Sequence, residues 1–152
     1  MIGLTNDYVE KLGLRLVVNF LGTFPCNIQP DVQGLKSFSA VFNESKHDEA
    51  GSHFVCVYAT EEKVYYFDSM GLDLENDYIK MFVFSCGRSV ATKNVQIQSI
   101  DSNMCGFFCI CFLLYMSLGL RFENFFNCFS RDLKLNDVIV IDFIKKMIEI
   151  KA

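Results

Sequence analysis

Histidine is scarce in this sequence. The chain contains two histidines, and it has no Cys-x-x-Cys pair accompanied by a second pair of ligands. Cys26, Cys86 and Cys128 lack a histidine at the spacing that zinc sites use. We therefore expect neither a metal site nor a cofactor.

The sequence also lacks a clear membrane span and a secretory signal. The one candidate span, residues 105–118, is about fourteen residues long without basic flanks, whereas a spanning helix needs roughly 20. We interpret it as a buried core helix. Residues 1–12 carry charges and no apolar stretch, so we expect a protein that is not secreted.

The cysteines support a reducing environment. They number seven, and most lie in apolar runs, as Cys56, Cys109 and Cys111 do. An odd number in such positions predicts mostly buried free thiols in place of a disulfide framework.

An excess of positive charge is absent as well. The chain has 14 basic and 18 acidic residues, a net charge of −4, and its Lys and Arg are scattered. This argues against a nucleic-acid-binding face. The hydrophobic fraction of 51% and the 16 phenylalanines exclude a disordered chain. We expect residues 1–152 to form one domain, which at this length buries roughly 68–70% of its unfolded surface.

Two strands in the middle of the chain give the strongest structural signal. Residues 53–58 and 63–67 are rich in aromatic and β-branched side chains, and a short polar segment, residues 59–62, separates them. This pattern predicts a β-hairpin. The other expected elements are a capped helix at 5–12 ending at Gly13, a strand or helix at 14–20, a loop at 22–34, a strand at 37–42, a helix at 74–84 with Tyr78, Met81 and Phe82 on one side, a half-buried strand at 94–100, a buried helix from about Asn103, and a final helix at 136–151. Together they indicate an α+β fold.

Cys105 is the candidate nucleophile. It stands where the polar turn 99–104 gives way to the apolar helix. The first amides of a helix have no intrahelical partner, and the helix dipole places positive potential there. A thiolate at this position is stabilised and is a better nucleophile than an ordinary thiol.

His53 and Asp68 are the candidate base and its orienting acid. His47 lies in the polar loop 44–49, and we expect it at the surface. His53 begins the first hairpin strand and Asp68 follows the second, so the hairpin places them side by side. A carboxylate there orients the imidazole and stabilises its charged form. The alternatives are a strand-end histidine bonded to backbone and an aspartate that merely initiates a turn.

Gln98 is a candidate donor to an oxyanion. It lies seven residues before Cys105, where a side-chain amide can assist the backbone N–H of the cysteine. Gln96 falls on the same face of the expected strand, and spacing alone does not choose between the two.

The order His, Asp, Gln, Cys-Gly resembles that of the adenovirus-type endopeptidases and their relatives, the SUMO-specific (Ulp-like) proteases. The matching residues are His53-Phe54, the segment 67–71, Gln98, and Cys105-Gly106 with the helix that follows. Residues 20–24, Phe-Leu-Gly-Thr-Phe, resemble an element near the N-terminus of the viral enzymes. The resemblance extends over residues 20–118.

This resemblance implies a papain-like α+β core, with a mixed central sheet packed by helices and the nucleophile at the start of the central buried helix. It implies a cysteine endopeptidase with catalytic residues His53, Asp68, Gln98 and Cys105, which cleaves viral capsid or core precursors at Gly-containing sites. We then expect the protein in the host cytoplasm or nucleus, or packaged in the virion. Two alternatives stay open, a ubiquitin- or SUMO-type isopeptidase and a non-catalytic binding domain.

The sequence also departs from the family pattern. Phe54 replaces the usual tryptophan, and Asp68 stands where adenoviral enzymes commonly have Glu. Adenoviral enzymes take a viral peptide and DNA as activators. Cys86 is a candidate counterpart of the cysteine that bonds the activating peptide, whereas the acidic charge does not favour dependence on DNA.

Overall fold

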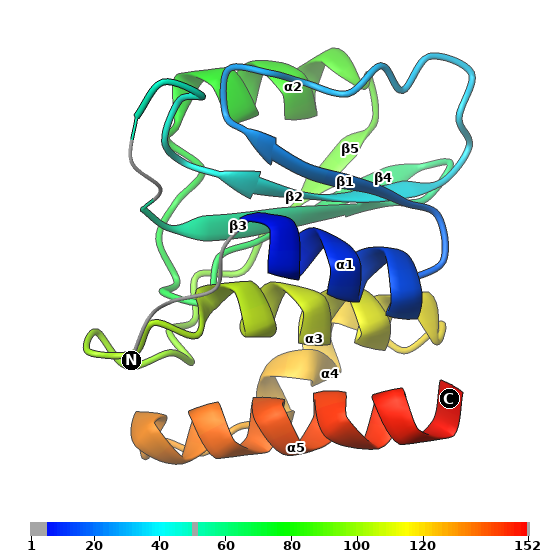
Figure 1. Cartoon of the computed structure of the whole chain (residues 1–152). Helices are drawn as coiled ribbons and strands as arrows, with labels where there is room; N and C mark the ends of the chain where they lie inside the picture. Colours follow the sequence, from blue (N-terminus) through cyan, green and yellow to red (C-terminus); the bar gives the residue numbers. More distant parts are fainter. Residues whose placement is uncertain (1–5, 50–51, 152) are drawn as a thin grey trace.

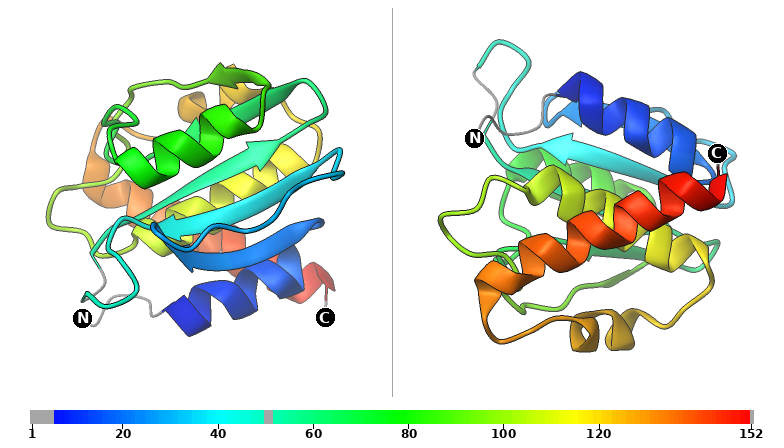
Figure 2. Two further views of the ribbon diagram at one scale, coloured as in Figure 1. Left: turned by 90° about the horizontal axis from the view of Figure 1, so that it is seen from above. Right: turned by 60° about the horizontal axis from the view of Figure 1, so that its bottom comes forward.

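The computed structural model describes residues 6–49 and 52–151 and has four layers (Figure 1). Helix α2 (Asp77–Ser85) covers one face of a central β-sheet. Helices α1 (Asn6–Leu16) and α3 (Cys105–Ser117) cover the other face. Helix α5 (Leu133–Lys151) packs on α3 from the side away from the sheet, as Figure 2 also shows. The short helices α4 (Phe122–Phe125) and η1 (Phe126–Cys128) connect α3 to α5.

The sheet is mixed, as expected for this fold class. Its strands lie in the order β1 (Phe20–Pro25), β2 (Phe38–Asn43), β3 (Phe54–Ala59), β4 (Lys63–Phe67) and β5 (Ser89–Ala91). The central pairs β2–β3 and β3–β4 are antiparallel. Each edge strand is parallel to its neighbour, β1 to β2 and β5 to β4. The predicted hairpin is confirmed as β3–β4, with Cys56 opposite Phe67.

The core lies on both faces of the sheet, and α3 is its centre. Ten of the thirteen residues of α3 are buried, because the sheet covers one side of the helix and α5 covers the other. A helix that is apolar all round is a buried helix, so the sequence interpretation of this segment is confirmed. Within the described residues, no helix has both the length and the apolar character needed to cross a membrane.

The N-terminal third differs from the sequence prediction. Gly13 does not end α1, which continues to Leu16. A Cβ atom at Gly13 would lie 2.3 Å from the Phe20 ring, so glycine here permits close packing of α1 on β1. The segment 22–25, predicted to be a loop, belongs to β1. Pro25 is compatible with this strand because β1 is at the sheet edge, where no ladder N–H is needed on the outer side.

Two later predictions were also wrong. Residues 94–100 form neither strand nor helix, and the strand nearest to them in the sequence is the short edge strand β5. The N–H groups of Ile97 and Gln98 both donate to the Ser69 carbonyl (2.9 and 3.0 Å), which excludes a regular ladder. Helix α2 buries Ile79, Phe82 and Val83, while Tyr78 and Met81 are exposed.

Candidate active site

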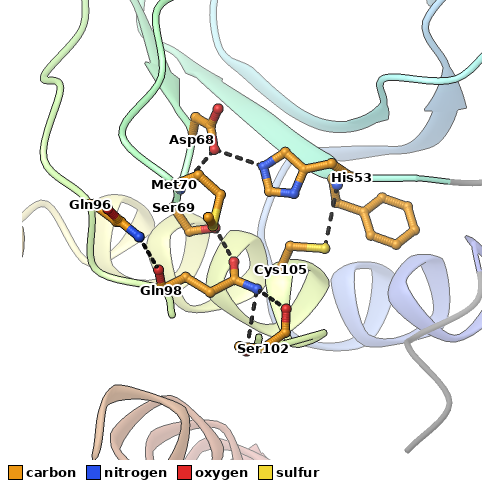
Figure 3. Close-up of polar contacts among 9 residues, drawn as sticks. His53, Asp68, Ser69, Met70, Gln96, Gln98, Ser102 and Cys105 are labelled. Carbon is orange, nitrogen blue, oxygen red and sulfur yellow. Dashed lines mark hydrogen bonds and ion pairs between the residues drawn. The ribbon is translucent and has the colours of Figure 1, made fainter. Parts of the chain in front are cut away.

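The β3–β4 hairpin joins His53 to Asp68. His53 immediately precedes β3, and Asp68 immediately follows β4. The imidazole Nε2 lies 2.7 Å from Asp68 Oδ1, with the two side chains 21% and 3% exposed (Figure 3). Asp68 Oδ1 also accepts the Met70 N–H at 2.9 Å. The carboxylate therefore contacts the ring and also forms the turn, so its place in the turn is compatible with a role in orienting His53.

Cys105 is the first residue of α3 and points toward His53 (Figure 3). The helix packs on β3, which places the sulfur beside the strand's first residue. The Phe54 N–H donates to Cys105 Sγ at 3.5 Å. The thiol thus lies at a helix N-terminus, next to a backbone donor and the imidazole, which is the kind of environment in which catalytic cysteines are found.

The electrostatics of His53 depend on both neighbours. Burial lowers the pKa of the imidazole, whereas the hydrogen bond to Asp68 and the interactions with Cys105 raise it, and the net result is a pKa of about 10. An imidazolium flanked by a carboxylate and a thiol is therefore the favoured form at neutral pH. Glu44 is a second carboxylic acid near this group. Burial raises the pKa of Glu44, the charge of His53 lowers it and that of Asp68 raises it.

Gln98 is buried and fully hydrogen-bonded. Its Oε1 accepts the Ser69 hydroxyl, and its Nε2 donates to the Ser102 carbonyl at 3.0 Å and to Ser102 Oγ at 3.3 Å (Figure 3). Gln96 is exposed and donates to the Gln98 carbonyl at 3.0 Å. Of the two glutamines that the sequence left open, only Gln98 contributes to the depression that contains Cys105.

This depression has a volume of about 280 Å³. Cys105 and His53 lie in it, and the apolar side chains of Met70 and Ile100 line its walls. Ile100 is 81% exposed, which leaves a large apolar side chain beside the candidate nucleophile. The remaining lining residues are Ser52, Phe54, Gln98, Ser102 and Asn103. Sequence reasoning missed Ser69 and Ser102, because a serine next to a turn gives no signal by itself.

Other thiols and histidines lie elsewhere. His47 is exposed, as predicted, and its Nδ1 lies 2.7 Å from Asn27 Nδ2. All seven cysteines are free, and besides Cys105 the buried ones are Cys26, Cys56, Cys109 and Cys111. Cys86 is only partly buried and Cys128 is exposed, so the expectation of buried thiols is correct for most of them. Burial raises the pKa of the Cys86, Cys109 and Cys111 thiols, which keeps them protonated. Among the described residues, no three His, Cys, Asp or Glu side chains gather as metal ligands do.

Comparison with known proteins shows that the chain is similar to viral proteases. The chain is 31% identical over 143 residues to the protease of bovine adenovirus 4, covering 82% of this chain and 71% of that protein. It is 28% identical over 153 residues to the protease of bovine adenovirus 7, covering 88% and 74%. No protein-family model matches the chain.

The fold is similar to that in the crystal structure of the selenomethionine-labelled ASFV pS273R protease, with a TM-score of 0.60 at 14% identity. This match covers 90% of the present chain but 66% of that protease, just under two thirds of its length. The likeness supports the fold class. The sequence identity to the bovine adenovirus 4 protein over most of both chains identifies the family, and the chain belongs to the adenovirus protease family and is a protease.

Proposed function

We propose that the protein is a cysteine endopeptidase in which Cys105 is the nucleophile, His53 the general acid and base, Asp68 the orienting acid, and Gln98 an oxyanion donor. The observation that carries the proposal is the contact series Asp68–His53–Cys105 at the start of α3. Nucleophile, base and orienting group in hydrogen-bonding reach are the requirement for nucleophilic catalysis.

The first half-reaction begins from the thiolate and the imidazolium. Cys105 Sγ attacks the scissile carbonyl carbon, a C–S bond forms, and the carbonyl π electrons move to oxygen. The backbone N–H of Cys105 and Gln98 Nε2 then stabilise the oxyanion, and for this Gln98 Nε2 exchanges one of its two hydrogen bonds to Ser102 for one to the oxyanion. When the tetrahedral species collapses, the C–N bond breaks and His53 gives its proton to the leaving amine. The products are a free amine and a thioester on Cys105.

The second half-reaction restores the enzyme. Neutral His53 takes a proton from water, and the resulting hydroxide attacks the thioester carbonyl. The C–S bond breaks and Cys105 leaves as thiolate, while the acyl group departs as a carboxylic acid. His53 ends protonated, as it began, and Asp68 stabilises that charge throughout.

The proposed substrates are viral precursor proteins cleaved at Gly-containing sites. A depression of about 280 Å³ bounded by Met70, Ile100 and a helix N-terminus supports this, because it admits backbone and small side chains next to Cys105. An activating peptide is a further proposed partner, since such activators were implied by the resemblance of residues 20–118 to adenoviral enzymes.

The test compares wild type with Cys105→Ala and with Cys128→Ala, a matched removal of an exposed thiol. We expect Gly-containing peptides to be cleaved by wild type and Cys128→Ala and left intact by Cys105→Ala. Limiting iodoacetamide with peptide mapping should label Cys105 first in wild type, and His53→Ala should abolish that preference. Turnover by Cys105→Ala would refute the mechanism. Labelling by a ubiquitin-like Gly-Gly vinyl sulfone, without peptide cleavage, would instead indicate a deconjugase.

A further inference from the structure

The coil that contains Gln98 has no secondary structure to keep it in place. Residues 92–104 are neither helix nor strand. On the sheet side, the Ser69 carbonyl accepts the Ile97 and Gln98 N–H groups. The opposite side of the coil contacts the first turns of α5, through Asn136 and Asp137. None of the steps proposed for catalysis uses these two residues.

Asn136 is fully buried, and every polar group of its side chain has a partner. Nδ2 donates to the Ile97 carbonyl at 2.8 Å and to the Ser130 carbonyl at 3.0 Å, and Oδ1 accepts the Ser130 N–H at 2.7 Å. Asparagine is an unfavourable residue inside a helix, and a buried amide destabilises the protein unless it is bonded. Its bond to Ile97 attaches α5 to the residue immediately before Gln98.

Asp137 acts on the other side of Gln98, through Ser102. Asp137 Oδ1 accepts the Ser102 hydroxyl proton at 2.9 Å. A hydroxyl has one proton and two lone pairs. With the proton directed to Asp137, the lone pairs of Ser102 Oγ accept from Met104 N (3.2 Å) and Gln98 Nε2 (3.3 Å). The carboxylate therefore determines which way the hydroxyl that faces Gln98 is oriented.

We propose that Asn136 and Asp137 are positioning residues that fix the side-chain amide of Gln98 for oxyanion binding. This inference rests on the oxyanion role of Gln98 in the proposed function. Neither residue touches substrate. Asn136 fixes the backbone before Gln98, and Asp137 fixes the acceptor of its Nε2. Displacement of the Gln98 amide should reduce kcat by roughly 5–20-fold, with little change in KM. This loss is smaller than the roughly 10²–10³-fold loss in kcat that follows deletion of an oxyanion donor.

The principal test uses Asp137, which is only partly buried, so that its variants fold. Asp137→Ala should lower kcat as stated. Asp137→Asn keeps an oxygen that accepts the Ser102 proton and should restore most of the rate. Asp142→Ala removes an exposed acid from the same helix and serves as the matched control. Equal kcat values for Asp137→Ala and Asp142→Ala, or a rate increase in Asp137→Ala, would overturn the proposal.

A double-mutant cycle separates positioning from general stability. In a Gln98→Ala background the Asp137→Ala penalty should vanish, because there is no amide left to position. An undiminished penalty would show that Asp137 acts by another route and would refute the inference while leaving the proposed function intact.

Hydrogen exchange gives a readout that needs no turnover. Asp137→Ala should accelerate exchange in the peptide 97–104, whose Met104 N–H donates to Ser102 Oγ, and leave β3 unchanged. If wild type cleaves no peptide, the proposed function fails and the oxyanion part of the inference fails with it, whereas this measurement still shows whether Asp137 holds the coil around Gln98. Unchanged exchange in 97–104 would mean that Asp137 does not hold this coil.

Discussion

His53 Nε2 and Asp68 Oδ1 lie 2.7 Å apart although the residues are separated by 15 positions in the sequence. The contact is a property of the hairpin, because β3 and β4 pair with Cys56 opposite Phe67 and this register places the residues at their open ends together. Burial of Asp68 keeps water from competing for the imidazole. The scaffold thus fixes the ring before any substrate arrives.

Asp68→Asn is expected to reduce kcat/KM by about 10²-fold or more, since the acid–base group loses its orienting charge. Asparagine keeps an oxygen that accepts the Met70 N–H, so the turn is retained. Without the carboxylate charge the pKa of His53 falls from about 10, and less imidazolium is present at neutral pH. The measurement is kcat/KM together with the rate of Cys105 alkylation at pH 7. Unchanged values of both would exclude Asp68 from the mechanism.

The stability of the fold is expected to depend on pH through His53. Its folded-state pKa of about 10 is raised above the ordinary value of 6.5. Protonation therefore favours the folded state fully below pH 6.5, and this contribution is lost as the pH rises through 10. Urea unfolding under reducing conditions should give a difference in stability between wild type and His53→Gln that shrinks between pH 6.5 and 10. A constant difference over that range would contradict the raised pKa.

Gln98→Ala is expected to lower kcat/KM by about 10²–10³ and to leave the alkylation rate of Cys105 nearly unchanged. In the proposed mechanism the amide acts on the oxyanion, and among the hydrogen bonds described it makes none to the thiol–imidazole pair. Gln96→Ala, the other glutamine favoured by spacing, is the matched comparison and should retain most of the activity because its side chain is exposed. A larger loss of kcat/KM in Gln96→Ala than in Gln98→Ala would assign the oxyanion role to Gln96.

The sequence was sufficient to predict those elements whose pairing partners are determined by a local sequence pattern. A short polar loop between two strand-like runs fixes an antiparallel pairing, which is why the proximity of His53 and Asp68 was predictable. The start of α3 was predictable to within two residues, because polar residues give way to a continuous apolar run at Cys105.

The surroundings of Gln98 were not predictable from the sequence. Its coil is bonded to Asn136 and to Asp137 across 39 and 35 residues of chain, and bonds between irregular segments have no periodicity to detect. The edge strand β1 was missed for a different reason. Gly22 and Pro25 usually interrupt strands. Gly22 lies at the register shift between Phe20 and Thr23, and Pro25 is acceptable because β1 is at the sheet edge.

Gly71 offers a test of how closely the turn after Asp68 supports the Gln98 coil. Its φ is +73°, and a Cβ atom there would lie 2.6 Å from Gln96 N and 2.7 Å from Val95 C. Gly87 has a similar φ of +68°, but no atom lies within 4 Å of its hypothetical Cβ. Gly87→Ala should therefore cost about 1–2 kcal/mol of unfolding free energy, from backbone strain alone.

Gly71→Ala should cost more than Gly87→Ala, because the backbone of residues 95–96 must move in addition. That movement shifts Gln98, so kcat/KM should fall further in Gly71→Ala than in Gly87→Ala at a temperature where both variants remain folded. Urea unfolding and peptide cleavage measure the two effects separately. Equal destabilisation by the two substitutions would show that the coil yields freely, and then the Ser69–Gly71 turn would not determine where the amide of Gln98 lies.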